Sequence, residues 1–220
     1  MRTPTREELS RLSARPLSPA RNRTKADVVL VPWEGTGIVV KDFRERGVLV
    51  RETIGRFSIA RECRAYGRLS GLAGVPAFVG RIDAHAFAVA LVPGKPLPSH
   101  PRRSLPPELF SALTELLERI HGRGVAIADL HHRNIIVGEA GDPPSIIDFS
   151  LAVVRHSSWN LPGRWIFERA QELDRIAMER IRRRYETGAD ENEDEIPPSR
   201  LYAWGRSFKN LSQRIRRKHS

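Results

Sequence analysis

The chain has 220 residues and a mass of 24.9 kDa, enough for one domain or for two small lobes that share a cleft. Apolar residues make up 40% and charged residues 29%, a balance that excludes wholesale disorder. A lone cysteine, Cys63, excludes an internal disulfide, and the net charge of +11 favours anionic partners such as nucleotides or anionic lipids.

The chain begins with two segments of different composition. Residues 1–23 are rich in Arg, Ser and Pro and lack the continuous apolar core of a signal peptide, so we expect a mobile basic arm. The β-branched runs 28–31 and 38–40 then flank a turn that contains Gly35 and Gly37. Two such runs around a glycine turn are typical of a β-hairpin.

The next segments complete a predicted nucleotide-binding N-terminal lobe over residues 24–93. Residues 57–69 carry apolar side chains at intervals of three and four, which predicts a helix. Residues 75–93 indicate two or three short strands that end at a Pro-Gly-x-Pro break. We therefore expect a small antiparallel sheet with one helix.

The rest of the chain is predicted to be mainly helical. A reduced second lobe is expected over residues 94–185, followed by an acidic loop and a basic tail in residues 186–220. Periodicity predicts helices at 105–121 and 168–185, and two apolar runs joined by a Gly- and Pro-rich turn predict a hairpin at 135–147. The later helix is expected to bury one face formed by Leu173, Ile176, Ala177 and Ile181. The fold class is therefore α+β with two lobes.

Lys41 and Glu62 form the first candidate pair. Lys41 directly follows the apolar run 38–40 of the predicted strand. Glu62 lies in the apolar stripe of the predicted helix, between Ile59 and Tyr66. A carboxylate on a face that packs against the core is costly unless it is paired. A strand lysine paired with a helix glutamate is how kinases position nucleotide phosphates. The alternative is a lysine that simply reaches solvent.

A second set of polar residues surrounds the predicted hairpin. Asp129 and Asn134 are five residues apart, the spacing of a kinase catalytic loop, and Asp148 follows the second strand. Because the two ends of an antiparallel pair are neighbours, Asn134 and Asp148 are expected to converge. Their oxygens make half of a Mg²⁺ site, which nucleotide phosphates and water complete. The alternative is a pair of turn-capping Asx residues.

The order of these residues resembles that of protein-kinase-like proteins. The resemblance extends over residues 27–184 and is carried by Lys41, Glu62, His121 to Val125, Asp129 to Asn134 and Asp148-Phe149-Ser150. Within that superfamily the chain looks most like the bacterial lipopolysaccharide kinases of the Kdo/WaaP family, with RIO-type kinases as relatives. The Arg-rich segment between Lys41 and Glu62 contributes to this likeness.

The resemblance implies a role for each candidate residue, with ATP and Mg²⁺ as cofactors. Lys41 would contact the nucleotide phosphates while Glu62 holds it in place. Asp129 would accept or orient the proton of the attacking hydroxyl, and Asn134 and Asp148 would hold the metal. These roles match what phosphoryl transfer needs, which is positioning and charge neutralisation.

The adenine base and the phosphates would be bound by two other segments. By the same resemblance, the backbone of the hinge that includes Leu91, Val92 and Gly94 would bind adenine. No Gly-rich loop precedes Lys41, so we expect the residues near 18–25 to face the phosphates, with Arg21, Arg23 and Lys25 supplying charge.

The predicted acceptor is a sugar hydroxyl of the lipopolysaccharide core. Ile127 and Ala128 replace the usual His-Arg before Asp129, and no Ala-Pro-Glu segment follows Asp148, which favours a lipid-linked sugar over a peptide. An atypical RIO-like serine/threonine protein kinase and a catalytically silent scaffold are the alternatives. His131 either stands where protein kinases place a transition-state lysine or only packs.

The basic tail at residues 206–219 is the remaining charged feature. It could bind anionic lipid, pair with the acidic loop or lie in solvent. No apolar run approaches the roughly 20 residues of a membrane span. The lone cysteine favours a reducing compartment, so we expect a cytoplasmic protein, with peripheral contact at the cytoplasmic face of the inner membrane as an option. Nucleic acid is not an expected partner, because no known nucleic-acid-binding motif supports it.

Overall fold

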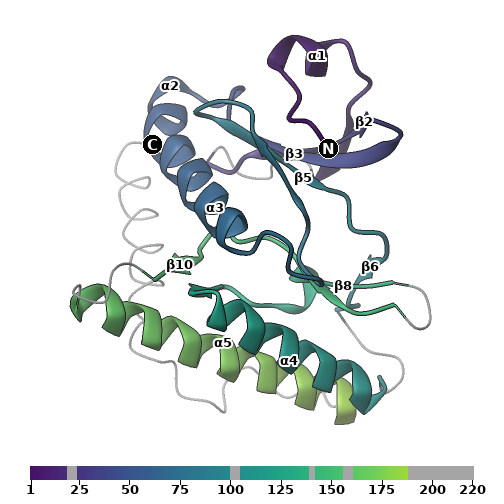
Figure 1. The fold of residues 1–220 in the computed structure, drawn as a ribbon, viewed down its shortest axis with the longest axis vertical. Coiled ribbons are helices and arrows are strands. Elements are labelled where there is room, and N and C mark those ends of the chain that lie inside the picture. The colour runs from purple at the N-terminus through teal and green to yellow at the C-terminus, as the bar shows by residue number, and fades with distance from the viewer. Residues whose placement is uncertain (19–23, 100–104, 139–141, 156–160, 188–220) are drawn as a thin grey trace, which may run out of the picture.

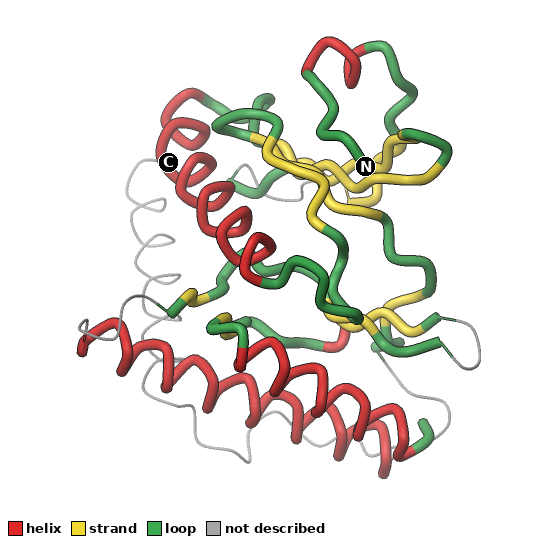
Figure 2. Tube along the Cα trace, viewed as in Figure 1, coloured by secondary structure: helices red, strands yellow, loops and turns green. Residues whose placement is uncertain are grey.

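The computed structural model describes residues 1–18, 24–99, 105–138, 142–155 and 161–187. Figure 1 shows a twisted sheet and one long helix in the upper part of the molecule and two long helices, α4 and α5, in the lower part. Short strands and loops lie between the two parts, as the coloured tube in Figure 2 makes clear. The predicted α+β architecture of two lobes is confirmed.

The upper lobe is built on a five-stranded antiparallel sheet with the order β1-β2-β3-β5-β4. Its strands are β1 (Arg15–Ser18), β2 (Asp27–Trp33), β3 (Thr36–Asp42), β4 (Phe78–Arg81) and β5 (Ala86–Ala90). The predicted hairpin is confirmed as β2 and β3, which turn through Glu34 and Gly35 with φ angles of 47° and 76°. Lys41 lies at the end of β3, opposite Val28 on one side and Phe87 on the other.

The helix of this lobe is longer than predicted at its start. It runs without a break through α2 (Val48–Val50), the π-helical turn η1 (Arg51–Gly55) and α3 (Arg56–Arg68). The buried face of α3 carries Ile59, Glu62 and Tyr66, which confirms the face predicted from the apolar spacing.

The described part of the lower lobe contains two α-helices and three short strand pairs around the loop that carries Asp129. Its helices are α4 (Pro107–Gly122) and α5 (Leu161–Thr187), with the 3₁₀ turn η2 (His132–Asn134) between them in sequence. Its strand pairs are β6 (Lys95–Pro96) with β8 (Ile135–Val137), β8 with β9 (Ser145–Ile146), and β7 (Val125–Ala126) with β10 (Val153–Val154). No helix among the described residues is long and apolar enough to cross a membrane.

The buried face of α5 differs from the predicted one. The buried residues of this helix are Phe167, Ala170, Asp174, Met178, Ile181 and Tyr185. Of the predicted face only Ile181 is fully buried, and Leu173, Ile176 and Ala177 are half-buried. The reason is that α5 packs against α4 and also against β7 and β10, so its buried stripe is rotated toward those strands.

One apolar core joins the two lobes. It includes Ile59 and Tyr66 from α3, Leu113 and Leu117 from α4, and Phe149 from the segment after β9. A second, smaller cluster lies on the other face of the sheet and contains Val31, Trp33, Ile38, Val40 and Ala88.

Residues 1–18 pack against the sheet and do not form the mobile arm predicted from their composition. They form α1 (Arg6–Ser10), which begins at a capping box of Thr5 and Glu8, and then the edge strand β1. Leu9 and Leu12 pack against the smaller apolar cluster, and the Thr3 hydroxyl donates to the Val79 carbonyl at 2.8 Å. The prediction from composition was wrong because Leu9 and Leu12 cover apolar surface of the sheet that would otherwise face water. Residues 19–23 lie outside the described residues.

The ion pairs of Arg6 are expected to raise the free energy of unfolding. Asp27 and Asp42 are directly opposite in the β2–β3 ladder, and like charges in that position are destabilising. Arg6 contacts Asp42 and Asp83, while Arg46 contacts Asp27. Arg6→Ala is therefore expected to lower the free energy of unfolding by about 2 kcal/mol, measured by urea denaturation.

The matched control for this change is Arg11→Ala. Arg11 pairs with Glu7 on the same short helix, but both side chains are more than 70% exposed, at 73% and 74%. Its loss is expected to cost less than about 0.5 kcal/mol. Equal effects of the two substitutions would show that Arg6 does not hold the segment to the sheet.

Candidate active site

Lys41 lies between a buried carboxylate, Glu62, and a partly exposed one, Asp148. Its ammonium nitrogen is 2.8 Å from Oε2 of Glu62 and 3.0 Å from Oδ1 of Asp148. Glu62 is only 1% exposed, and its other oxygen accepts a hydrogen bond from the Ser58 hydroxyl at 3.2 Å. The predicted pair of Lys41 and Glu62 is thus present, whereas the contact with Asp148 was not predicted.

The electrostatics of this set favour the charged form of Lys41. Burial works against its charge, but the carboxylates of Glu62 and Asp148 outweigh burial and raise the pKa of Lys41. Burial also opposes ionisation of Asp148, yet the Lys41 ammonium lowers the pKa of this carboxyl below its ordinary value. A fixed ammonium is therefore positioned where phosphate oxygens could replace one of its carboxylate partners.

The segment that carries Asp148 is held by an aromatic contact. Phe149 is fully buried, and its ring meets that of Tyr66 on α3 edge-on at 5.1 Å. Asp148 itself has a φ angle of 66°, in the left-handed region that non-glycine residues rarely adopt. Its Oδ1 accepts a hydrogen bond from the Ser150 amide at 3.1 Å, which stabilises this conformation. The aromatic contact thus couples the position of Asp148 to α3, which also carries Glu62.

The hairpin brings Asn134 next to Asp148 as predicted. Ile135 pairs with Ile146, and the amide of Ile147 donates to the Asn134 carbonyl at 2.8 Å, so Asn134 lies beside the residue that precedes Asp148. Nδ2 of Asn134 donates to the carbonyl of Asp129 at 3.3 Å, which leaves the amide oxygen as the end available to a ligand.

These two residues fit a magnesium ion in part. A carboxylate and a carboxamide oxygen are hard donors of the kind that Mg²⁺ binds, usually together with substrate phosphates and water. No group of three or more His, Cys, Asp or Glu that could hold a metal occurs in the described part of the chain. Asn134 and Asp148 would therefore hold the ion only when a nucleotide supplies further oxygens.

The loop that presents Asp129 is anchored from α5 by Asp174. The Asp174 carboxylate is 1% exposed and accepts hydrogen bonds from the amides of Ile127 and Ala128, at 2.7 and 2.8 Å. It also lies 2.9 Å from Nε2 of His121, at the end of α4. Ala128 has a φ angle of 61°, so this anchor holds a strained backbone immediately before Asp129, whose side chain is exposed.

Asp174 was missed at the level of sequence, although the same signal that identified Glu62 was present. It is a carboxylate within the buried stripe of a helix, between Ala170 and Met178. The predicted stripe consisted of Leu173, Ile176, Ala177 and Ile181 and did not include Asp174.

The hinge segment joins β5 to β6. The Leu91 amide already donates to the Gly37 carbonyl at 2.9 Å, so this group is not free to bind adenine. Gly94 has a φ of 124°, and a Cβ atom there would lie 2.5 Å from the Val137 carbonyl oxygen. Glycine is therefore required for the close approach of this segment to β8, and Val92 is half-buried beside it.

Of the remaining predicted residues, the structure describes His131 and Lys25. His131 is half-buried, its Nδ1 has no hydrogen-bond partner within the described structure, and its ring is 6.2 Å from that of His132. Arg21 and Arg23, expected to face the phosphates, and the tail at 206–219 lie outside the described residues. Lys25 is described, and its carbonyl accepts a hydrogen bond from Arg46 at 2.7 Å.

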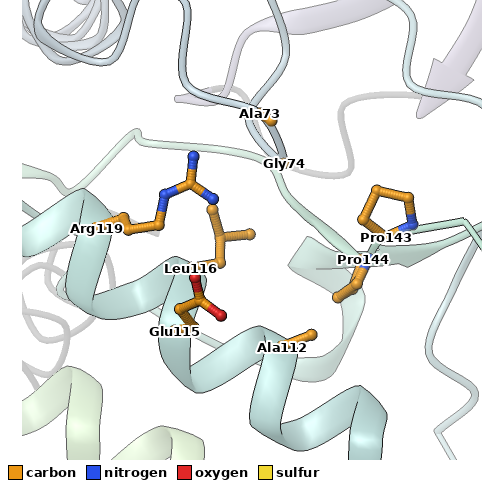
Figure 3. A pocket seen from close by; sticks show the side chains of 8 residues that line it. All are labelled: Ala73, Gly74, Ala112, Glu115, Leu116, Arg119, Pro143 and Pro144. Atoms are coloured by element: carbon orange, nitrogen blue, oxygen red, sulfur yellow. The ribbon is translucent and has the colours of Figure 1, made fainter.

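A small pocket elsewhere is not this site. It has a volume of about 170 Å³ and lies between α4 and the loops at Gly74 and Pro144, with Glu115 and Arg119 on one wall (Figure 3). None of the predicted site residues lines it.

The comparisons with known proteins agree with this geometry at the level of the fold. No family model matches the chain, and no curated protein matches it. Among solved structures, two of the Rio2 kinase from Chaetomium thermophilum, one of them a complex with ADP, Mg²⁺ and phosphoaspartate, superimpose with TM-scores of 0.58 and 0.56. The fold is protein-kinase-like.

The sequence identity to the two Rio2 structures is low, and the chain matches only part of their length. Both structures share 20% sequence identity with the chain and cover 84% and 79% of it. The chain spans only 60% and 55% of the length of those proteins. At this identity the similarity supports the protein-kinase-like fold and nothing finer. The closer relation to lipopolysaccharide kinases stays a prediction.

Proposed function

We propose that this protein is a phosphotransferase that uses ATP and Mg²⁺. The observation that supports this most directly is the contact of Lys41 with both Glu62 and Asp148. Asn134 lies beside the residue before Asp148 and donates to the carbonyl of Asp129, whose side chain is exposed. The neighbouring Rio2 structure with ADP and Mg²⁺ shows that a protein of this fold holds such ligands. Bound Mg²⁺ would neutralise charge on the phosphates.

The transfer itself needs few groups of the protein. The acceptor oxygen would form a bond to the γ-phosphorus while the bond from that phosphorus to the bridging oxygen of ADP breaks. Asp129 would take the proton of the attacking hydroxyl, and Lys41 would donate to phosphate oxygens. The contribution of the chain is thus to position reactants and to stabilise charge.

A thermal-shift experiment tests the nucleotide site. Mg·ATP at about 100 times its dissociation constant adds about 2.7 kcal/mol to stability, which for a chain of this size raises Tm by roughly 5–10 °C. The rise is expected to require Mg²⁺ and to disappear in Asp148→Ala.

The control is Asp142→Ala, which removes an exposed carboxylate from the β8–β9 turn and is expected to keep the full shift. If millimolar Mg·ATP does not change Tm of the unmodified protein, the catalytically silent scaffold becomes the better explanation.

For the acceptor, we propose the sugar of a lipid-linked lipopolysaccharide core. The support is the resemblance to the Kdo/WaaP family and the absence of an Ala-Pro-Glu segment from the sequence. On this proposal the protein acts in the cytoplasm or at the cytoplasmic face of the inner membrane, and the tail at 206–219 contacts anionic lipid.

An atypical RIO-like serine/threonine protein kinase is the second candidate, and the two Rio2 structures favour it. Transfer of radiolabelled phosphate from ATP to core oligosaccharide, to protein substrates or to the chain itself separates the possibilities. Label on the chain that hydroxylamine removes would indicate an acyl phosphate, the group named in one of the Rio2 complexes.

A further inference from the structure

The N-terminal end of the long helix in the upper lobe exposes large apolar side chains. Val48, Leu49, Ile54 and Phe57, here called the apolar tip, are 66%, 79%, 48% and 67% exposed. The same helical run buries its opposite face in the core, through residues such as Ile59 and Tyr66. A surface helix normally presents polar residues to water, so apolar residues on both faces indicate that something binds the outer one.

The segment that carries the apolar tip has more arginines than acidic residues. Residues 44–68 contain seven arginines and three glutamates. Of these glutamates, Glu62 is buried against Lys41, and Glu52 pairs with Arg51 and Arg56. Arg46 pairs with Asp27 and Arg61 contacts the Ser150 carbonyl, and the segment still has more arginines than acidic residues beside its exposed apolar side chains. This is the composition of helices that lie in the headgroup region of anionic membranes.

The position of the tip suits contact with a plane. Figure 1 places α2 at the periphery of the molecule, on the far side of the upper lobe from α4 and α5. Such a location lets the tip reach a flat surface without a clash with the lower lobe.

The tip also continues toward the candidate active site. The guanidinium of Arg61 lies 5.2 Å from the ring of Phe57 and contacts the carbonyl of Ser150. Leu151, the next residue, is itself 48% exposed. A ligand on the tip would thus touch the helix that carries Glu62 close to the segment that carries Asp148.

We infer that the apolar tip and its arginines bind the surface of an anionic lipid bilayer, with Leu49 and Phe57 entering the headgroup region. This surface includes no residue of the basic tail, and its binding does not depend on phosphoryl transfer. The charge excess favours anionic lipid over an apolar patch of another protein, for which neutral surroundings would suffice.

A fluorescent reporter tests the position of insertion. In the full chain carrying Cys63→Ser, Leu49→Cys is labelled with an environment-sensitive fluorophore, and Ile166→Cys, an exposed apolar site on α5, serves as the control label. Vesicles with about one third phosphatidylglycerol are expected to raise emission at position 49 several-fold and shift it to the blue, whereas phosphatidylcholine alone does not. Added salt should reverse the change.

Unlabelled variants test the same surface without a probe. Leu49→Glu with Phe57→Glu is expected to weaken co-sedimentation with anionic vesicles at least ten-fold. The matched pair Leu161→Glu with Ile166→Glu, whose positions are 70% and 47% exposed in the other lobe, is expected to leave binding unchanged. Both pairs lie on the surface, so Tm should stay close to that of the parent protein.

Three results would overturn the proposal. The first is fluorescence emission at position 49 that stays unchanged when the protein binds vesicles, which would assign binding to the tail. The second is an equal effect, or no effect, of the two glutamate pairs. The third is emission that rises with protein concentration and without vesicles, which would identify a second copy of the chain as the occupant.

Discussion

Replacing Asp174 with alanine is expected to lower the free energy of unfolding by about 3–5 kcal/mol. The carboxylate accepts hydrogen bonds from the amides of Ile127 and Ala128 and lies 2.9 Å from the ring of His121. Alanine leaves these buried donors without an acceptor, and each such donor costs about 1–3 kcal/mol. Urea denaturation of the two proteins measures the difference directly.

Two further variants separate this anchor from a general effect on α5. Glu172→Ala removes a carboxylate that is 54% exposed and paired with Arg169, and it is expected to change stability by less than about 0.5 kcal/mol. Asp174→Asn keeps one acceptor oxygen and should lie between the other two. If Asp174→Ala were as stable as Glu172→Ala, the strained backbone at Ala128 would have to be held by other contacts.

Lys41→Met is expected to be the second strongly destabilising substitution, by about 3 kcal/mol. Without the ammonium, Glu62 remains a buried carboxylate that is 1% exposed and has lost its charged partner. The double variant Lys41→Met with Glu62→Met should recover most of this loss, because apolar residues of similar volume often replace a buried ion pair at little cost. Urea denaturation of the two single variants and the double variant gives the coupling energy.

The same variants distinguish stability from function. Neither Lys41→Met nor the recovered double variant is expected to show the Tm increase with Mg·ATP, because the proposed phosphate contact is gone in both. Additive stability losses would contradict a direct pair between Lys41 and Glu62. A full nucleotide shift in the double variant would remove Lys41 from the proposed binding site.

Part of the candidate site could be predicted because its residues break a local pattern. Glu62 is a charge in an apolar stripe, and burial of that stripe requires a partner for the charge. Asn134 and Asp148 flank a two-stranded pair, and antiparallel geometry brings such ends together whatever the rest of the fold does. In each case a short stretch of chain contains the whole reason for the contact.

Other features could not be predicted from the sequence, because they depend on contacts between segments that are far apart along the chain. Asp174 interrupts an apolar stripe as Glu62 does, but α5 has apolar residues on two adjacent faces, and its packing against β7 and β10 decides which face is buried. The N-terminal residues were predicted to be mobile from their charge and prolines. Their order comes from Leu9 and Leu12, which cover apolar side chains of a sheet formed much later in the chain.

Local residue patterns were enough to predict the two lobes, the order of the candidate site residues and the pairing of Lys41 with Glu62. These follow from periodicity, from turn residues and from the cost of an unpaired buried charge, all of which act over short distances along the chain. The contact of Asp148 with Lys41 and the anchoring of the loop before Asp129 by Asp174 became visible only in the folded chain. The structure also showed that the start of the α2–α3 helix faces solvent with apolar residues. These contacts join segments up to 107 residues apart, and they exist only after both lobes pack onto one core.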